Sequence, residues 1–282
     1  MGWKIWQQSE KKLLDFYATL RDPFQVLTIT LLSLLLPLSF LLLARLSTAH
    51  YLLAFTAYST PPQSSLIFSL LLNTYPFLLH GLVSIVSVTT FVHCSTGRLT
   101  PITELPALML RPGLYTAWIL LCTLQVCVGL GIEGTIAAGI DGSDFGQERS
   151  LLGRVIFFLG LHETMLYWSR TVVKRVVDDT VFGFAREERW VERVAMGASF
   201  GVLWWWRLRG EVESLVVVAE VKRELLMGVG VADFVSWWLY YLTVMIGMVR
   251  LVKGLIWLGM IFLCRRVEGS LGDPRPNVDE KV

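Results

Sequence analysis

Residues 24–45 read FQVLTITLLSLLLPLSFLLLAR, and this stretch decides the fold class. It runs for 21 positions without an acidic or basic side chain before Arg45 is reached. A helix rises about 1.5 Å per residue, so about 20 apolar residues cross the roughly 30 Å hydrocarbon core of a bilayer. Lipid offers no partner for backbone amides, which leaves a helix as the only structure that a single run of this length can form there. The run therefore predicts a transmembrane helix near the N-terminus.

Several more apolar runs follow, and together they predict an all-α, polytopic transmembrane helix bundle with about six spans. The expected spans cover residues 24–45, 65–92, 113–139, 151–171, 194–206 and 225–249. Pro76 lies in the middle of the second span and predicts a kink there. The fifth span is short for a crossing, and a last apolar piece at 251–264 is shorter than a full crossing needs. Whether these two segments cross completely is left open.

The remaining segments are polar or amphipathic. Residues 1–22 place aromatic and leucine side chains at helical spacing among lysines, which predicts an amphipathic cytosolic helix lying at the membrane surface. An ordinary cytosolic helix packed on its own protein is the alternative. The transmembrane domain then covers 23–264, and the tail 265–282 is polar and expected to be disordered. Residues 172–193 predict an amphipathic helix leaving the bilayer, and 207–224 a charged loop.

Composition supports a membrane protein and argues against nucleic-acid binding. Hydrophobic residues make up 54% of the chain and charged residues only 17%, whereas soluble domains carry about 25% charge. The net charge of +2 gives no electrostatic basis for binding nucleic acid. The expected partners are membrane lipids and a membrane-protein partner. Lysine and arginine gather on alternate sides of the spans, with 207–224 as the exception, which places both termini in the cytosol, in an endomembrane or the plasma membrane. If the fifth span does not cross, the C-terminus faces outward instead.

Ionisable side chains inside spans are the candidates for substrate or ion binding, because each costs roughly 2.5–3.5 kcal/mol to insert. The candidates are His80, Glu133, Arg154, His162 and Asp233. Glu133 and Arg154 fall at similar depths in neighbouring spans and are expected to pair across the hairpin. Such a pair could fix the register of the hairpin, or its carboxylate could sense a solute or a proton. Either group could instead extend to the interface.

His80 and His162 both fall near the middle of their spans and could meet there. With the adjacent Glu163 they could form an acid–base pair acting on lipid. The sequence His-Glu-Thr-Met-Leu begins like HExxH but lacks the second histidine, so we assign no metal site. A hydrogen-bonded core histidine is the favoured interpretation. No catalytic residue and no cofactor is assigned.

Small and aromatic residues predict close helix packing. The GxGxxG match at Gly129–Gly134 lies inside an apolar span with no preceding strand, so it does not predict a dinucleotide site. Gly197–Gly201 is a GxxxG pattern and predicts a face where another helix approaches closely. The mid-span aromatics Trp237, Trp238 and Tyr240 predict either helix packing or a cavity for an apolar ligand.

The absence of a recognised chemical motif favours a non-enzymatic adaptor or accessory subunit. Two alternatives from other classes remain. One is a small-solute or proton-coupled carrier that uses Glu133 and Asp233. The other is a lipid-modifying membrane enzyme that uses His162 and Glu163.

Overall fold

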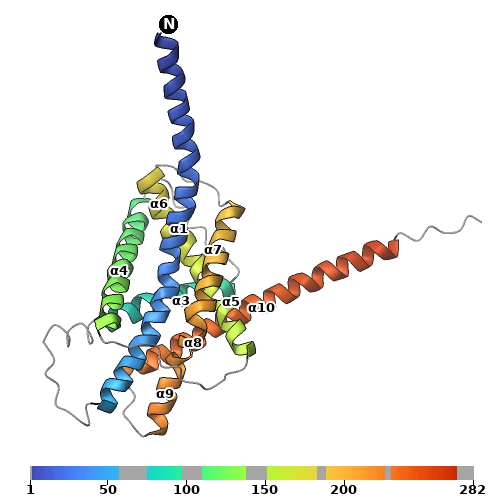
Figure 1. Cartoon of the computed structure of the whole chain (residues 1–282). Helices are drawn as coiled ribbons and strands as arrows, with labels where there is room; N and C mark the ends of the chain where they lie inside the picture. The colour runs from blue at the N-terminus through green and yellow to red at the C-terminus, as the bar shows by residue number, and fades with distance from the viewer. Residues whose placement is uncertain are drawn as a thin grey trace, which may run out of the picture.

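Figure 1 shows the computed structural model of the chain, a bundle of long helices around a central N-terminal helix. The structure describes residues 2–56, 75–96, 110–137, 151–182, 189–225 and 230–271. These residues are helical apart from short turns and contain no strand. The all-α prediction is therefore confirmed for the described part of the chain.

Helix α1, Gly2–Thr56, joins the predicted surface helix, the first span and part of the expected loop into one helix. The predicted loop start at residue 46 is wrong, because Thr48 and Ala49 are buried inside the bundle. The Thr48 hydroxyl donates to the carbonyl of Ala44 one turn earlier, so this polar side chain is satisfied within the helix. The side chains of residues 2–21 lie outside the described set, and the amphipathic character of that segment stays a prediction.

Helices α3, Tyr75–Thr96, and α4, Leu110–Ala137, correspond to the second and third predicted spans. Pro76 is the second residue of α3 as described. Residues 65–74, which formed the first part of the predicted span, lie outside the described residues, so the predicted kink is not tested.

A continuous helical segment runs antiparallel to α1. It consists of α5 (Leu151–Trp168), η3 (Ser169–Val173), α6 (Lys174–Val177) and η4 (Asp178–Phe182), the two η segments being π-helical. Trp168 donates its indole N–H to the Leu32 carbonyl at 3.3 Å, and Gln25 donates to Asp178 at 3.1 Å. As residue numbers rise along this segment, its partners on α1 have lower residue numbers. The segment and α1 are therefore antiparallel.

A second helical segment runs parallel to α1. The prediction of a charged loop at 207–224 is wrong, because these residues belong to this segment. The segment consists of α7 (Trp190–Leu203), the π-helical η5 (Trp204–Leu208), α8 (Arg209–Glu211) and α9 (Ser214–Glu224). Arg189 contacts Asp22 at its start, and Glu211 contacts Arg45 further along. Glu211, Glu213 and Lys222 of this segment are buried or partly buried, and each pairs with a residue on another helix.

Helix α10, Val231–Leu271, joins the predicted sixth span and the last apolar piece into one helix. The predicted break at residue 250 is therefore wrong, and the helix extends past the expected start of the tail at 265; residues 272–282 lie outside the described residues. α10 runs parallel to α3, because His80 contacts Ser236 and the Cys94 carbonyl contacts Lys253. In Figure 1 its orange N-terminal part crosses the bundle and its red C-terminal part projects beyond it.

Two glycines allow α5 and α10 to cross with their backbones in contact. A Cβ atom added to Gly160 would overlap the Thr243 carbonyl and lie 2.9 Å from the backbone nitrogen of Gly247. A Cβ atom on Gly247 would likewise overlap the Ile156 carbonyl. The predicted GxxxG face is not such a crossing, because a Cβ atom on Gly201 would meet nothing within 4 Å.

Four of the described helices are long and apolar enough to cross a membrane: Asp22–Leu52, Phe77–Thr96, Leu114–Ile132 and Val231–Phe262. These four apolar helices suggest a membrane protein. The predicted spans at 151–171 and 194–206 are not among them, so the expected number of about six is not confirmed. Both segments nevertheless form part of the bundle, where α5 packs against α10 and α7 against α1.

Candidate functional site: ion pairs between packed helices

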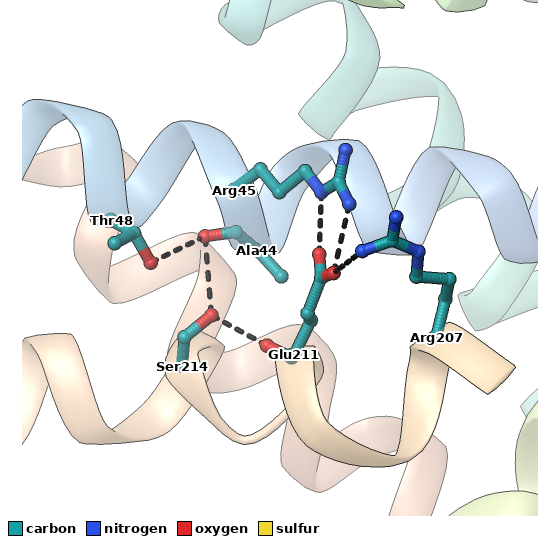
Figure 2. Close-up of polar contacts among 6 residues, drawn as sticks. All are labelled: Ala44, Arg45, Thr48, Arg207, Glu211 and Ser214. Carbon is teal, nitrogen blue, oxygen red and sulfur yellow. Dashed lines mark hydrogen bonds and ion pairs between the residues drawn. The ribbon is translucent and has the colours of Figure 1, made fainter. Parts of the chain in front are cut away.

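The α8–α9 turn carries an ion-pair cluster that faces α1 (Figure 2). Both oxygens of Glu211 accept hydrogen bonds from Arg45, from Nε at 2.5 Å and from Nη2 at 2.8 Å. Arg207, one helical turn before Glu211, lies 3.7 Å from the same carboxylate. An arginine that donates two parallel hydrogen bonds to a carboxylate fixes the orientation of the carboxylate and also balances its charge. The pair therefore fixes the position of the turn on α1.

A second arginine grips the same turn from α5. Arg154 donates to both oxygens of Glu213, from Nε at 2.5 Å and from Nη2 at 3.1 Å. Only 9% of the Glu213 side chain is exposed. The sequence singled out Arg154 but proposed Glu133 as its partner. The Glu133 side chain lies outside the described residues, so that pairing is not tested.

Hydroxyl groups complete this junction. Ser214 Oγ lies 3.2 Å from the Ala44 carbonyl oxygen and 2.6 Å from the Glu211 carbonyl oxygen. Figure 2 shows that the Thr48 hydroxyl also reaches the Ala44 carbonyl. Ser214 therefore joins the α1 backbone to the turn next to the Arg45–Glu211 pair, whereas the Thr48 hydrogen bond lies within α1.

Asp233, a predicted ion-binding carboxylate, accepts three hydrogen bonds from two donor groups. Lys222 Nζ lies 2.9 Å from one of its oxygens and 2.8 Å from the other, and the Gly230 N–H donates at 3.1 Å. Both charged side chains are more than 90% buried. Asp233 lies in the first turn of α10 and Lys222 lies on α9, so the pair links the two helices. A carboxylate already neutralised by a fixed ammonium has less capacity to bind a coupling ion.

The two predicted mid-membrane histidines lie at different levels. His80 is buried and its Nε2 lies 2.8 Å from Ser236 Oγ. His162 stacks on Phe158, with ring centroids 6.3 Å apart, and its neighbour Glu163 faces Arg250. The backbone of Gly160, two residues before His162, meets α10 at Thr243 and Gly247, about two to three turns beyond Ser236. The structure therefore does not bring the two histidines together.

The mid-span aromatic residues include one that packs against a neighbouring helix. The Tyr240 ring stacks on Phe157 of α5, with centroids 4.8 Å apart and an interplanar angle of 19°, and it is buried. Phe157 also contacts Phe40 of α1 edge to face. For Tyr240 the packing interpretation therefore describes the observed contacts.

Sequence reasoning missed the partners of the site. Glu211, Glu213 and Lys222 lay in a segment interpreted as a loop, and Arg45 was treated only as the end of a span. The Lys174–Glu192 contact at 3.9 Å, between α6 and α7, was also missed. The excess of charge in 207–224 was the available signal, because charges next to apolar runs such as Leu215–Val218 are expensive unless paired.

The arrangement neutralises charges between helices. In the part of the chain that the structure describes, no group of three or more histidine, cysteine, aspartate or glutamate residues is placed to hold a metal ion. Comparison of the chain with protein-family models, curated proteins and solved structures finds no match. The interpretation of the site therefore rests on its own geometry.

Proposed function

We propose that this chain is an integral multi-pass membrane protein that acts as a non-enzymatic adaptor or accessory subunit. The observation that carries the proposal is the pairing of ionisable side chains across helix contacts. Arg45 pairs with Glu211, Arg154 with Glu213 and Lys222 with Asp233. Carriers and enzymes need intramembrane charges that can change partner or protonation state. Bidentate pairs between packed helices instead support a structural role.

An adaptor also needs a surface for its partner, and α10 supplies one. Every described side chain from Val252 to Phe262 is exposed, and most are large and apolar; Trp257 is 65% exposed. The end of this helix projects from the bundle in Figure 1. A helix that is apolar on all sides must be covered by lipid or by another helix. We assign residues 255–262, the large apolar part of this stretch beyond Lys253, as the contact with a membrane-protein partner.

Site-specific photocrosslinking in native membranes tests the adaptor proposal. A benzophenone amino acid replaces Trp257 in one variant and Ile119 of α4, which is 66% exposed, in the control. The proposal predicts one discrete protein adduct from position 257 and none from position 119. Lipid adducts alone at both positions would contradict it. Reconstituted protein that moves a solute, with movement lost in Asp233→Asn, would support the carrier alternative instead.

A further inference from the structure

A polar cluster lies where the C-terminal end of α3 meets α5 and α10. Its members are Cys94, Glu163, Arg250 and Lys253. Lys253 donates to the Cys94 carbonyl, one of the last four carbonyls of α3, which have no partner within their own helix. Arg250 contacts Glu163, and Lys253 lies three residues further along α10 on the same face, so the two contacts are adjacent.

Glu163 differs from the other paired acids of the bundle. Its Oε2 atom is buried and has no hydrogen-bond partner among the described residues. Arg250 Nε lies 3.4 Å away, longer than the roughly 2.7–2.9 Å of a charge-assisted hydrogen bond. Glu211 and Glu213, in contrast, each accept two hydrogen bonds from one arginine. A buried carboxylate oxygen without a hydrogen-bond donor is costly, so the Glu163 carboxylate has acceptor capacity left for a hydrogen bond from a ligand.

The basic side of the cluster is open. The Arg250 side chain is 57% exposed, against 13% for Glu163. Lys253 is also exposed and, three residues further along α10, shares a helix face with Arg250. The candidate span on α3 ends at Thr96, two residues after Cys94. The cluster therefore lies at the end of the α3 span. Basic side chains between helices at that level are suited to lipid phosphate.

We propose that this cluster binds the headgroup of a phospholipid that carries a primary ammonium. The ammonium donates to the Glu163 carboxylate, whose side chain is 13% exposed, and the phosphate accepts from Arg250 and Lys253. The site lies at α3, α5 and α10 rather than at the projecting end of α10, so it goes beyond the adaptor role and does not depend on it.

Lipid binding to the full-length wild-type chain in detergent, measured by native mass spectrometry, tests the proposal without any mutation. The lipids are dioleoyl phosphatidylethanolamine, its monomethyl and dimethyl derivatives, and dioleoyl phosphatidylcholine. Each methyl group removes one N–H, and the choline headgroup has none. We expect affinity to fall by about tenfold over the series, with the largest step between the dimethyl derivative and phosphatidylcholine, where the last N–H and its charge-assisted hydrogen bond are lost. Equal binding of all four lipids would overturn the proposal.

Two variants with matched controls separate the two halves of the headgroup. Glu163→Gln should lower the affinity for phosphatidylethanolamine to that for phosphatidylcholine, whereas Glu224→Gln, at an exposed acid on α9, should change neither. Arg250→Gln should weaken both lipids, whereas Arg223→Gln, an exposed base on α9, should not. Retention of the ethanolamine preference in Glu163→Gln would overturn the assignment. Competition by soluble phosphoethanolamine at the lipid concentration would overturn the choice of a lipid ligand.

Discussion

Replacing Gly160 by alanine tests the contact between α5 and α10. The added Cβ atom would lie 2.9 Å from the Gly247 nitrogen, about 0.5 Å inside an ordinary contact, and would overlap the Thr243 carbonyl further. Both obstacles are backbone, so the helices must separate. A gap of about 0.5–1 Å forfeits a quarter to a half of each dispersion contact across the interface. From the usual destabilisation that overpacking causes in a well-packed core, we expect the free energy of unfolding to fall by about 2–3 kcal/mol.

The matched control is Gly201→Ala. This glycine is also helical, but a Cβ atom there meets nothing within 4 Å. Alanine is the better helix former by about 1 kcal/mol, so this variant should be neutral or slightly more stable. Equilibrium unfolding in mixed micelles, followed by tryptophan fluorescence, measures both variants. If Gly160→Ala is as stable as Gly201→Ala, the close crossing is refuted. The double variant Gly160→Ala, Gly247→Ala should lose less than the sum of the single variants, because both probe one contact.

Three further predictions follow from the bundle. Trp168→Phe should lose about 0.5–1.5 kcal/mol of stability in the same unfolding assay, because it removes one buried hydrogen bond to an α1 carbonyl; an unchanged stability would exclude that bond. Lys222→Met should lower the free energy of unfolding by about 3–5 kcal/mol, because it leaves the buried Asp233 carboxylate without its ammonium partner. Arg189→Gln, which breaks an exposed pair with Asp22, should lower it by at most about 1 kcal/mol. Equal losses in the two variants would contradict the burial of the Lys222–Asp233 pair. The native protein should stay in the membrane pellet after alkaline carbonate extraction and require detergent for release, and recovery in the aqueous fraction would contradict a multi-pass membrane protein.

The apolar helices could be predicted from the sequence because crossing a bilayer depends on composition and length within one segment. The run at 24–45, for example, lies within the candidate span Asp22–Leu52 of α1. The predicted boundaries were less accurate. The sequence placed a loop at 46 where the small residues Ser47 and Thr48 are buried in a helix that continues to Thr56.

The site could not be predicted because its partners are far apart in the chain. Glu211 and Glu213 look like solvated charges until Arg45 and Arg154 are placed beside them by the packing of α1 and α5. The close crossing was missed for the same reason. Gly160 belongs to no GxxxG pattern, and its importance comes from a backbone approach by α10 that local sequence does not encode.

A double-mutant cycle on Arg154 and Glu213 tests most directly whether the charges of this bundle are paired within it. Replacing Arg154 by methionine should cost about 3–5 kcal/mol, because it leaves the Glu213 carboxylate, only 9% exposed, without its arginine; Glu213→Met should cost less, because the Arg154 side chain is 21% exposed. Replacing both should cost much less than the sum, with a coupling energy of about 2 kcal/mol or more. Additive losses in micelle unfolding would mean that the two charges do not depend on each other, and the account of an internally neutralised bundle would be contradicted.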